Sequence, residues 1–143
     1  MPSRNVATEP SIAIVGGCGH VGLPLGIAFA RAGARVTLVD TDAERVAAVR
    51  AGKMPFLERG ADRALPEALA TGRLTAVPSL AAMPETEFVI VAIGTPVDEF
   101  LEPAVHAFDR SIDLVLEHVR DGQCLVIDKP VVDVFGFLRK RRA

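Results

Sequence analysis

The chain has 143 residues, of which 50% are hydrophobic and 24% are charged, with 16 basic residues against 18 acidic ones. This length and composition fit one globular domain with its own core. A net charge of -2, without Trp or Tyr, excludes a strongly basic nucleic-acid-binding protein and a stacking platform for single strands. No segment approaches the roughly 18 apolar residues of a membrane helix, so we expect a cytoplasmic protein with no membrane partner.

Five short apolar runs predict strands. Each run is continuously apolar rather than alternating, which is typical of strands buried on both faces of a parallel sheet. In chain order, the predicted strands are residues 11–16, 35–40, 73–77, 87–93 and 123–128.

Four segments between these strands have helical signals. Gly33 ends the first helix, and Thr41 with Glu44 forms a capping box that begins the second. The predicted helices are residues 20–32, 41–52, 61–71 and 103–122, with a loop at 53–60. The alternation predicts an α/β fold, a Rossmann-type doubly wound parallel sheet in a single domain at residues 11–128. A flexible N-terminus (1–10) and a C-terminal tail (129–143) flank it.

A GxGxxG motif at residues 17–22 follows the first strand and opens the first helix, the context in which this motif binds dinucleotides. We expect Gly17 to allow the tight turn and Gly19 to admit a pyrophosphate close to the backbone. Gly22, extended by Gly26, would let the helix pack close to the sheet. The alternative is a glycine-rich turn without a ligand. The candidate cofactor-binding residues of this loop are Gly17, Cys18, Gly19, His20, Val21 and Gly22.

Asp40 ends the second predicted strand, at the place where an acid accepts hydrogen bonds from ribose hydroxyls. Its charge would repel a 2′-phosphate, so we expect NAD rather than NADP. The alternative is that Asp40 only helps Thr41 to cap the next helix. Thr41 and Arg45 complete this part of the candidate cofactor site.

Gly94, Thr95 and Pro96 follow the fourth predicted strand, where loops of a doubly wound sheet line the ligand crevice. They are candidate cofactor residues, with a purely structural turn as the alternative. Neither the histidines nor the two cysteines have metal-site spacing, so we expect no metal. Cys18 and Cys124 are expected to be reduced thiols of the core.

Four ordered stretches resemble the UDP-glucose/GDP-mannose dehydrogenase family. Within the family, the chain is most similar to the UDP-N-acetylmannosamine and UDP-N-acetylglucosamine dehydrogenases. The likeness extends from about Ile12 to Asp128, after which the chain departs from the family pattern. The four stretches are 17–25 (GCGHVGLPL), 52–58 (GKMPFLE), 72–74 (GRL) and 94–99 (GTPVDE).

The resemblance implies more than this chain contains. Full members oxidise the C6 alcohol of a UDP-sugar to a carboxylate in two NAD-linked steps. Their catalytic cysteine and lysine, a helical dimerisation region and a UDP-binding domain all lie beyond the first domain. Cys124 and Lys129 do not correspond to the catalytic pair. The resemblance places Thr95 near the nicotinamide half of NAD.

We therefore expect a single truncated NAD-binding domain of a nucleotide-sugar 6-dehydrogenase, inactive alone, that would meet a UDP-sugar only when the missing parts are supplied. A fragment, a frame-shifted product and a genuine short protein all fit the sequence. Two other functions stay open. One is a non-catalytic NAD sensor or interaction module whose tail (131–142) docks a partner, and the other is a non-functional remnant.

Overall fold

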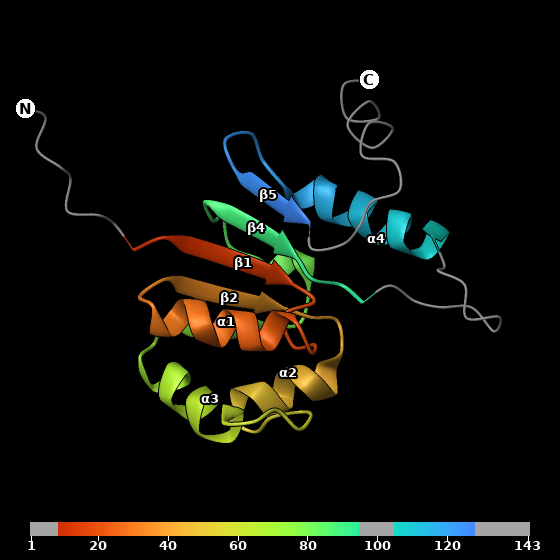
Figure 1. Ribbon diagram of the computed structural model, residues 1–143. Helices are drawn as coiled ribbons and strands as arrows, with labels where there is room; N and C mark the ends of the chain where they lie inside the picture. Colours follow the sequence, from red (N-terminus) through yellow and green to blue (C-terminus); the bar gives the residue numbers. More distant parts are fainter. Residues whose placement is uncertain (1–8, 95–104, 128–143) are drawn as a thin grey trace, which may run out of the picture.

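A computed structural model describes residues 9–94 and 105–127 of the chain. Its described part forms a five-stranded parallel sheet in the order β3-β2-β1-β4-β5, with helices packed on it (Figure 1), which confirms the predicted fold class. The elements are β1 (Ser11–Val15), α1 (Gly22–Arg31), β2 (Arg35–Val39), α2 (Ala43–Arg50), α3 (Ala61–Ala70), β3 (Leu74–Val77), the 3-10 helix η1 (Leu80–Ala82), β4 (Phe88–Val91), α4 (Val105–His118) and β5 (Cys124–Ile127).

The strand order reverses its direction at β1. The chain builds outward from β1 to β2 and β3, then returns to place β4 and β5 on the other side of β1. The carboxyl ends of β1 and β4 therefore lie next to each other while the segments after them diverge. In open α/β sheets, ligands bind in the crevice at this switch point.

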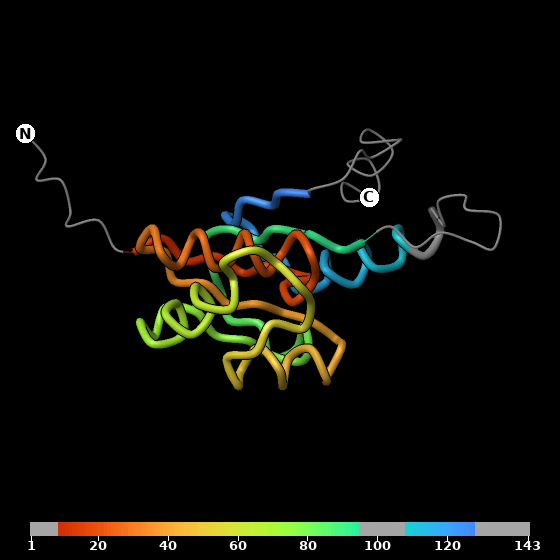
Figure 2. The backbone as a smooth tube through the Cα atoms, turned by 60° about the horizontal axis from the view of Figure 1, so that its bottom comes forward, coloured from red at the N-terminus to blue at the C-terminus, as the bar shows by residue number. Residues whose placement is uncertain are grey.

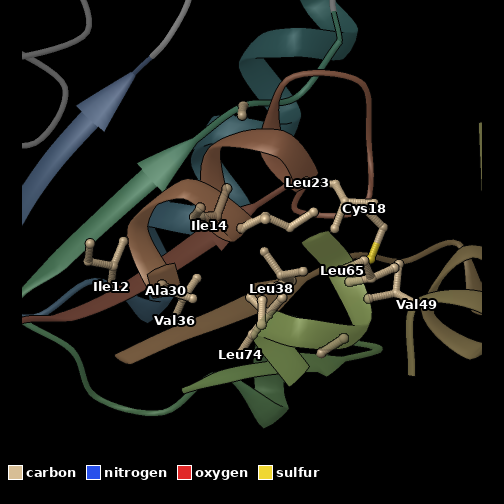
Figure 3. Close-up of a cluster of buried hydrophobic side chains, with 14 of the residues drawn as sticks. Ile12, Ile14, Cys18, Leu23, Ala30, Val36, Leu38, Val49, Leu65 and Leu74 are labelled. Atoms are coloured by element: carbon tan, nitrogen blue, oxygen red, sulfur yellow. The ribbon is translucent and has the colours of Figure 1, made fainter. Parts of the chain in front are cut away.

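Two hydrophobic clusters hold the layers together, one on each face of the sheet. The first joins β1, β2, β3 and β4 to α1, α2 and α3, with Ile14, Leu38, Leu23 and Leu65 fully buried (Figure 3). The second joins β1, β2 and β4 to α4 through residues such as Val115. The view in Figure 2 separates α2 and α3 from α4. The continuously apolar strands thus serve both faces, as their pattern predicted.

The prediction that both cysteines belong to the core is correct for Cys18 and wrong for Cys124. Cys124 begins β5, the edge strand, and pairs in register with Phe88 of β4. Phe88 (39%) and Val126 (43%) of the same strand pair are also exposed. The buried cluster on the α1 side includes Ile90 of β4 but no residue of β5, so this face of the edge strand is left exposed in the described part of the chain.

The capping box predicted at Thr41 is also wrong, because the N-cap of α2 is Asp42. Its Oδ1 accepts hydrogen bonds from the backbone N–H groups of Glu44 (3.1 Å) and Arg45 (3.2 Å). A carboxylate satisfies these unpaired donors and also interacts favourably with the positive end of the helix. Asp42 therefore takes the cap, and α2 begins one residue later than Thr41 would allow.

Substitution of each residue in turn should show whether Thr41 or Asp42 caps α2. We expect Asp42→Ala to lower the free energy of unfolding by about 1 kcal/mol, the usual cost of losing a side-chain cap. Thr41→Ala should leave it within about 0.5 kcal/mol of the original value. Urea unfolding followed by circular dichroism measures both. Equal losses in the two variants would contradict the assignment of the cap to Asp42.

Candidate functional site

A cleft of about 880 Å³ lies at the carboxyl ends of β1, β2 and β4, between the glycine turn and α4. This volume is in the range of small-molecule and cofactor sites. The structure brings most of the predicted site residues together in its lining. Those that line it are Gly19, His20, Val21, Asp40, Thr41, Arg45 and Gly94.

Three other predicted residues lie beneath the cleft rather than in its wall. Gly17, Cys18 and Gly22 are buried and form the floor of the turn. Thr95 and Pro96 fall outside the described residues, so their predicted place at the cofactor stays a prediction.

The tight turn after β1 depends on Gly16, not on Gly17 as the sequence indicated. Gly16 has φ +76°, which favours glycine. The role of Gly17 is close approach, since a Cβ there would lie 2.7 Å from the carbonyl oxygen of Ile14 and 2.8 Å from the Cα of Leu38. The N–H groups of Gly16 and Gly17 both donate to the carbonyl oxygen of Val39, at 2.8 and 3.1 Å. The turn is therefore seated on the end of β2.

The later glycines of the motif have different surroundings. A Cβ on Gly22 would overlap the carbonyl oxygen of Gly16, and one on Gly26 would lie 2.6 Å from Cδ2 of Leu38. Both therefore allow the close packing of α1 that was predicted. At Gly19, the nearest atom to an added Cβ would be the carbonyl oxygen of Gly16, at 3.4 Å. The space on the open side of Gly19 is what a group approaching the backbone needs.

The backbone at the start of α1 offers unpaired donors to the cleft. The N–H groups of His20, Val21 and Gly22 have no acceptor among residues 9–94 and 105–127, and two of these residues, His20 and Val21, line the cleft. They stand at the positive end of α1, where backbone donors and the helix dipole together favour an anion. This turn can therefore hold a phosphate or diphosphate.

Asp40 is held in a fixed position beside this turn. Its Oδ2 accepts from the N–H of Cys18 at 3.1 Å, and its Oδ1 accepts from the N–H of Asp42 at 2.9 Å. Because Asp42 caps α2 itself, capping does not account for the position of Asp40. Each oxygen of its carboxylate can accept a further hydrogen bond, and the residue lines the cleft.

Cys18 contributes to the site through its backbone. Its side chain points into the core toward Leu65 and Val49 (Figure 3). Burial, and next the negative charge of Asp40, raise the pKa of the Cys18 thiol to about 12. The thiol therefore stays protonated at neutral pH and is no nucleophile.

One wall of the cleft was missed by sequence reasoning. It consists of Leu80 in η1 together with Ser111 and Leu114 on α4. Leu114 is 53% exposed, although it is a large apolar residue on a helix. The signal available in the sequence was an apolar residue outside the helix face that carries Ile112 and Val115, both of which are buried.

The described residues show no group of three or more His, Cys, Asp or Glu side chains that could hold a metal ion. In the same part of the chain, no helix is long and apolar enough to cross a membrane.

The NAD binding domain of the UDP-glucose/GDP-mannose dehydrogenase family matches residues 10–135 of this sequence. The chain belongs to this family. The match includes residues 129–135, which the sequence analysis had placed in a divergent tail and which lie outside the described residues. The expected cofactor, NAD, is that of the family's domain.

Individual family members are similar over most of this chain. UDP-glucose 6-dehydrogenase of Pseudomonas aeruginosa is 43% identical over 119 residues, which are 82% of this chain and 26% of that protein. UDP-N-acetyl-D-mannosamine dehydrogenase of Pyrococcus horikoshii is 28% identical over 115 residues, 80% of this chain and 27% of that protein. A solved UDP-D-ManNAc dehydrogenase from Pyrococcus horikoshii superposes with a TM-score of 0.79 at 26% identity, covering 92% of this chain and 31% of that chain.

The chain spans about a quarter of the length of the curated relatives it matches. The solved UDP-D-ManNAc dehydrogenase agrees with the expected similarity to dehydrogenases of N-acetylated sugars. Between the two curated relatives, however, the UDP-glucose enzyme has the higher identity. The comparisons therefore define the family without defining the sugar.

The close approach of the glycine turn to the end of β2 can be tested by adding one methyl group at Gly17. We expect Gly17→Ala to lower the free energy of unfolding by about 2 kcal/mol, because backbone atoms must move to admit the Cβ. Gly94→Ala is the matched control, since an added Cβ there meets nothing within 4 Å. Urea unfolding measures both, and a Gly17→Ala variant as stable as the control would contradict the close approach.

The two thiols should differ in reactivity. We expect Ellman's reagent to modify one thiol rapidly in the native protein and both in denaturant, because Cys124 is exposed and Cys18 is buried. Cys124→Ser should remove the rapid reaction. Rapid reaction of two thiols in the native protein would show that Cys18 is not enclosed by the core.

Proposed function

We propose that the cleft binds NAD through the residues that line it and distinguishes NAD from NADP at Asp40. The observation that carries this proposal is that one cleft holds both the unpaired N–H groups at the start of α1 and the fixed carboxylate of Asp40. The donors suit a diphosphate, and the carboxylate suits the hydroxyls of a ribose.

The remaining lining residues suit the other parts of a dinucleotide. The apolar wall of Leu80 and Leu114 offers a surface for a planar base, and Gly94, which follows β4 and lines the same cleft, would lie near the nicotinamide half. Nicotinamide, when bound, accepts a hydride from the substrate. The role of this chain would be to hold and orient the cofactor, because the rate of hydride transfer depends strongly on the proximity and orientation of the reacting groups.

Arg45 bears on the choice between NAD and NADP. It lines the same cleft, and its Nε lies 3.5 Å from Oδ2 of Asp42, within its own helix turn. This pairing offsets part of the positive charge that a 2′-phosphate would need. Asp40 then sets the sign of the local charge, and we expect NAD to be preferred.

The oxidation of a UDP-sugar is the reaction of the longer enzymes to which this chain is similar. Their names state oxidation of UDP-glucose or UDP-N-acetylmannosamine. We propose that this chain is the cofactor-binding part of such a UDP-sugar 6-dehydrogenase, which converts a C6 alcohol to a carboxylate. We expect it to be inactive alone, because the family resemblance places the sugar site and the nucleophile beyond this domain. The two free thiols are consistent with a cytoplasmic location.

Isothermal titration calorimetry with NAD and NADP tests this proposal. The wild-type chain should bind NAD saturably and bind NADP more weakly. We expect Asp40→Asn to weaken NAD binding by about 10-fold, the value of one or two charged hydrogen bonds, while the ratio of NADP to NAD affinity rises. Asp62→Asn, an exposed acid on α3, is the matched control and should bind NAD like the wild type.

Two results would contradict it. A folded wild-type chain that gives no binding heat with NAD at several temperatures would favour a remnant over a cofactor domain. An unchanged affinity ratio in Asp40→Asn would remove Asp40 from the selection between NAD and NADP.

A further inference from the structure

The side chain of His20 has an aromatic neighbour from a distant segment. Its ring stacks on the ring of Phe56, with centroids 4.1 Å apart and planes inclined by 29°. Phe56 lies between α2 and α3, and Figure 2 shows this yellow segment passing beside the turn after β1. The contact connects the glycine turn to a part of the chain that the function described so far does not use.

The two partners of this stack differ in their surroundings. Phe56 is half-buried and packs against the cluster that joins α1, α2 and α3 to the sheet, so its ring has a fixed support. His20 is exposed and lines the cleft. A stacked ring has one face covered while the nitrogen atoms at its edge stay accessible. In the described part of the chain, neither ring nitrogen of His20 has a hydrogen-bond partner.

The position of His20 in the turn places its ring near the backbone donors that would bind a diphosphate. Its own backbone N–H is the first of the three unpaired donors at the start of α1. We propose that Phe56 is a positioning residue that holds the His20 ring at the edge of the cleft, so that a ring N–H donates to the diphosphate of NAD. The inference rests on the proposed function and adds a side-chain donor to the backbone donors.

The stack matters because the ring would otherwise lose rotamer freedom when the ligand binds. Ordering a free side chain opposes binding, and an interaction that orders it in advance removes this cost from binding. The stacking of two aromatic rings stabilises their arrangement beyond the effect of the area they bury. Phe56 therefore acts on affinity through His20 without touching the ligand.

The test uses ligands with and without the diphosphate. Adenosine, ADP and NAD are titrated into the 143-residue chain and followed by two-dimensional ¹H–¹⁵N NMR, which measures millimolar as well as micromolar affinities. His20→Phe keeps an aromatic ring for the stack but has no N–H. Phe56→Leu keeps apolar volume but has no ring, and Phe56→Tyr keeps the ring.

We expect His20→Phe and Phe56→Leu each to weaken ADP and NAD binding by about 5-fold, in proportion to one partly exposed hydrogen bond, with adenosine affinity unchanged. Phe56→Tyr should bind like the wild type. The double variant should be no weaker than His20→Phe alone, because Phe56 acts only through His20.

Three results would overturn the inference. Wild-type ADP affinity in His20→Phe would show that the ring donates nothing, while the proposed function would stand. An equal loss for adenosine in Phe56→Leu would show that Phe56 only supports the fold. Failure of the folded wild-type chain to bind ADP and NAD would overturn the proposed function as well, so the two failures are distinguishable.

Discussion

The close packing of the glycine turn against the end of β2 is the constraint that determines the shape and the donors of the cleft. The N–H groups of Gly16 and Gly17 donate to the Val39 carbonyl, and that of Cys18 donates to the Asp40 carboxylate. These donors face inward and fix the turn. The N–H groups of His20 and Val21, which line the cleft, have no such partner in the described residues, so they are available to a ligand. The same short run of backbone therefore both anchors α1 and provides an anion site.

The burial of Cys18 makes this seating durable. Its thiol fills space among Leu65 and Val49, which come from α3 and α2, while its N–H orients the carboxylate in the cleft wall. A displacement of the turn would empty a core position and release Asp40 at the same time. The core on the α1 side and the proposed ribose contact are thus parts of one arrangement, and sequence motifs alone do not reveal this dependence.

Much of the fold was predictable because its signals are local and mutually consistent. The apolar runs predicted the strands, and the strand–turn–helix context of residues 17–22 predicted the switch-point cleft with Asp40 beside it. The errors have physical reasons. Thr41 and Asp42 are adjacent residues of types that can cap a helix, and only the backbone geometry shows that Asp42 is the N-cap. Cys124 has an apolar strand sequence, but its exposure depends on the edge position of β5 in the sheet. The contact of Phe56 with His20 joins segments far apart in sequence, so no local pattern predicts it.

The two exposed apolar side chains of the cleft wall, Val21 (51%) and Leu114 (53%), link ligand occupancy to the persistence of the fold. Without a bound ligand, water would contact this apolar surface. A dinucleotide lying there would cover it only in the folded state, and a ligand that binds only the folded state stabilises it by mass action. On the proposed function, the lifetime of the domain would then rise and fall with the supply of its cofactor. The pool of NAD would act on this protein as a folding partner as well as a reactant.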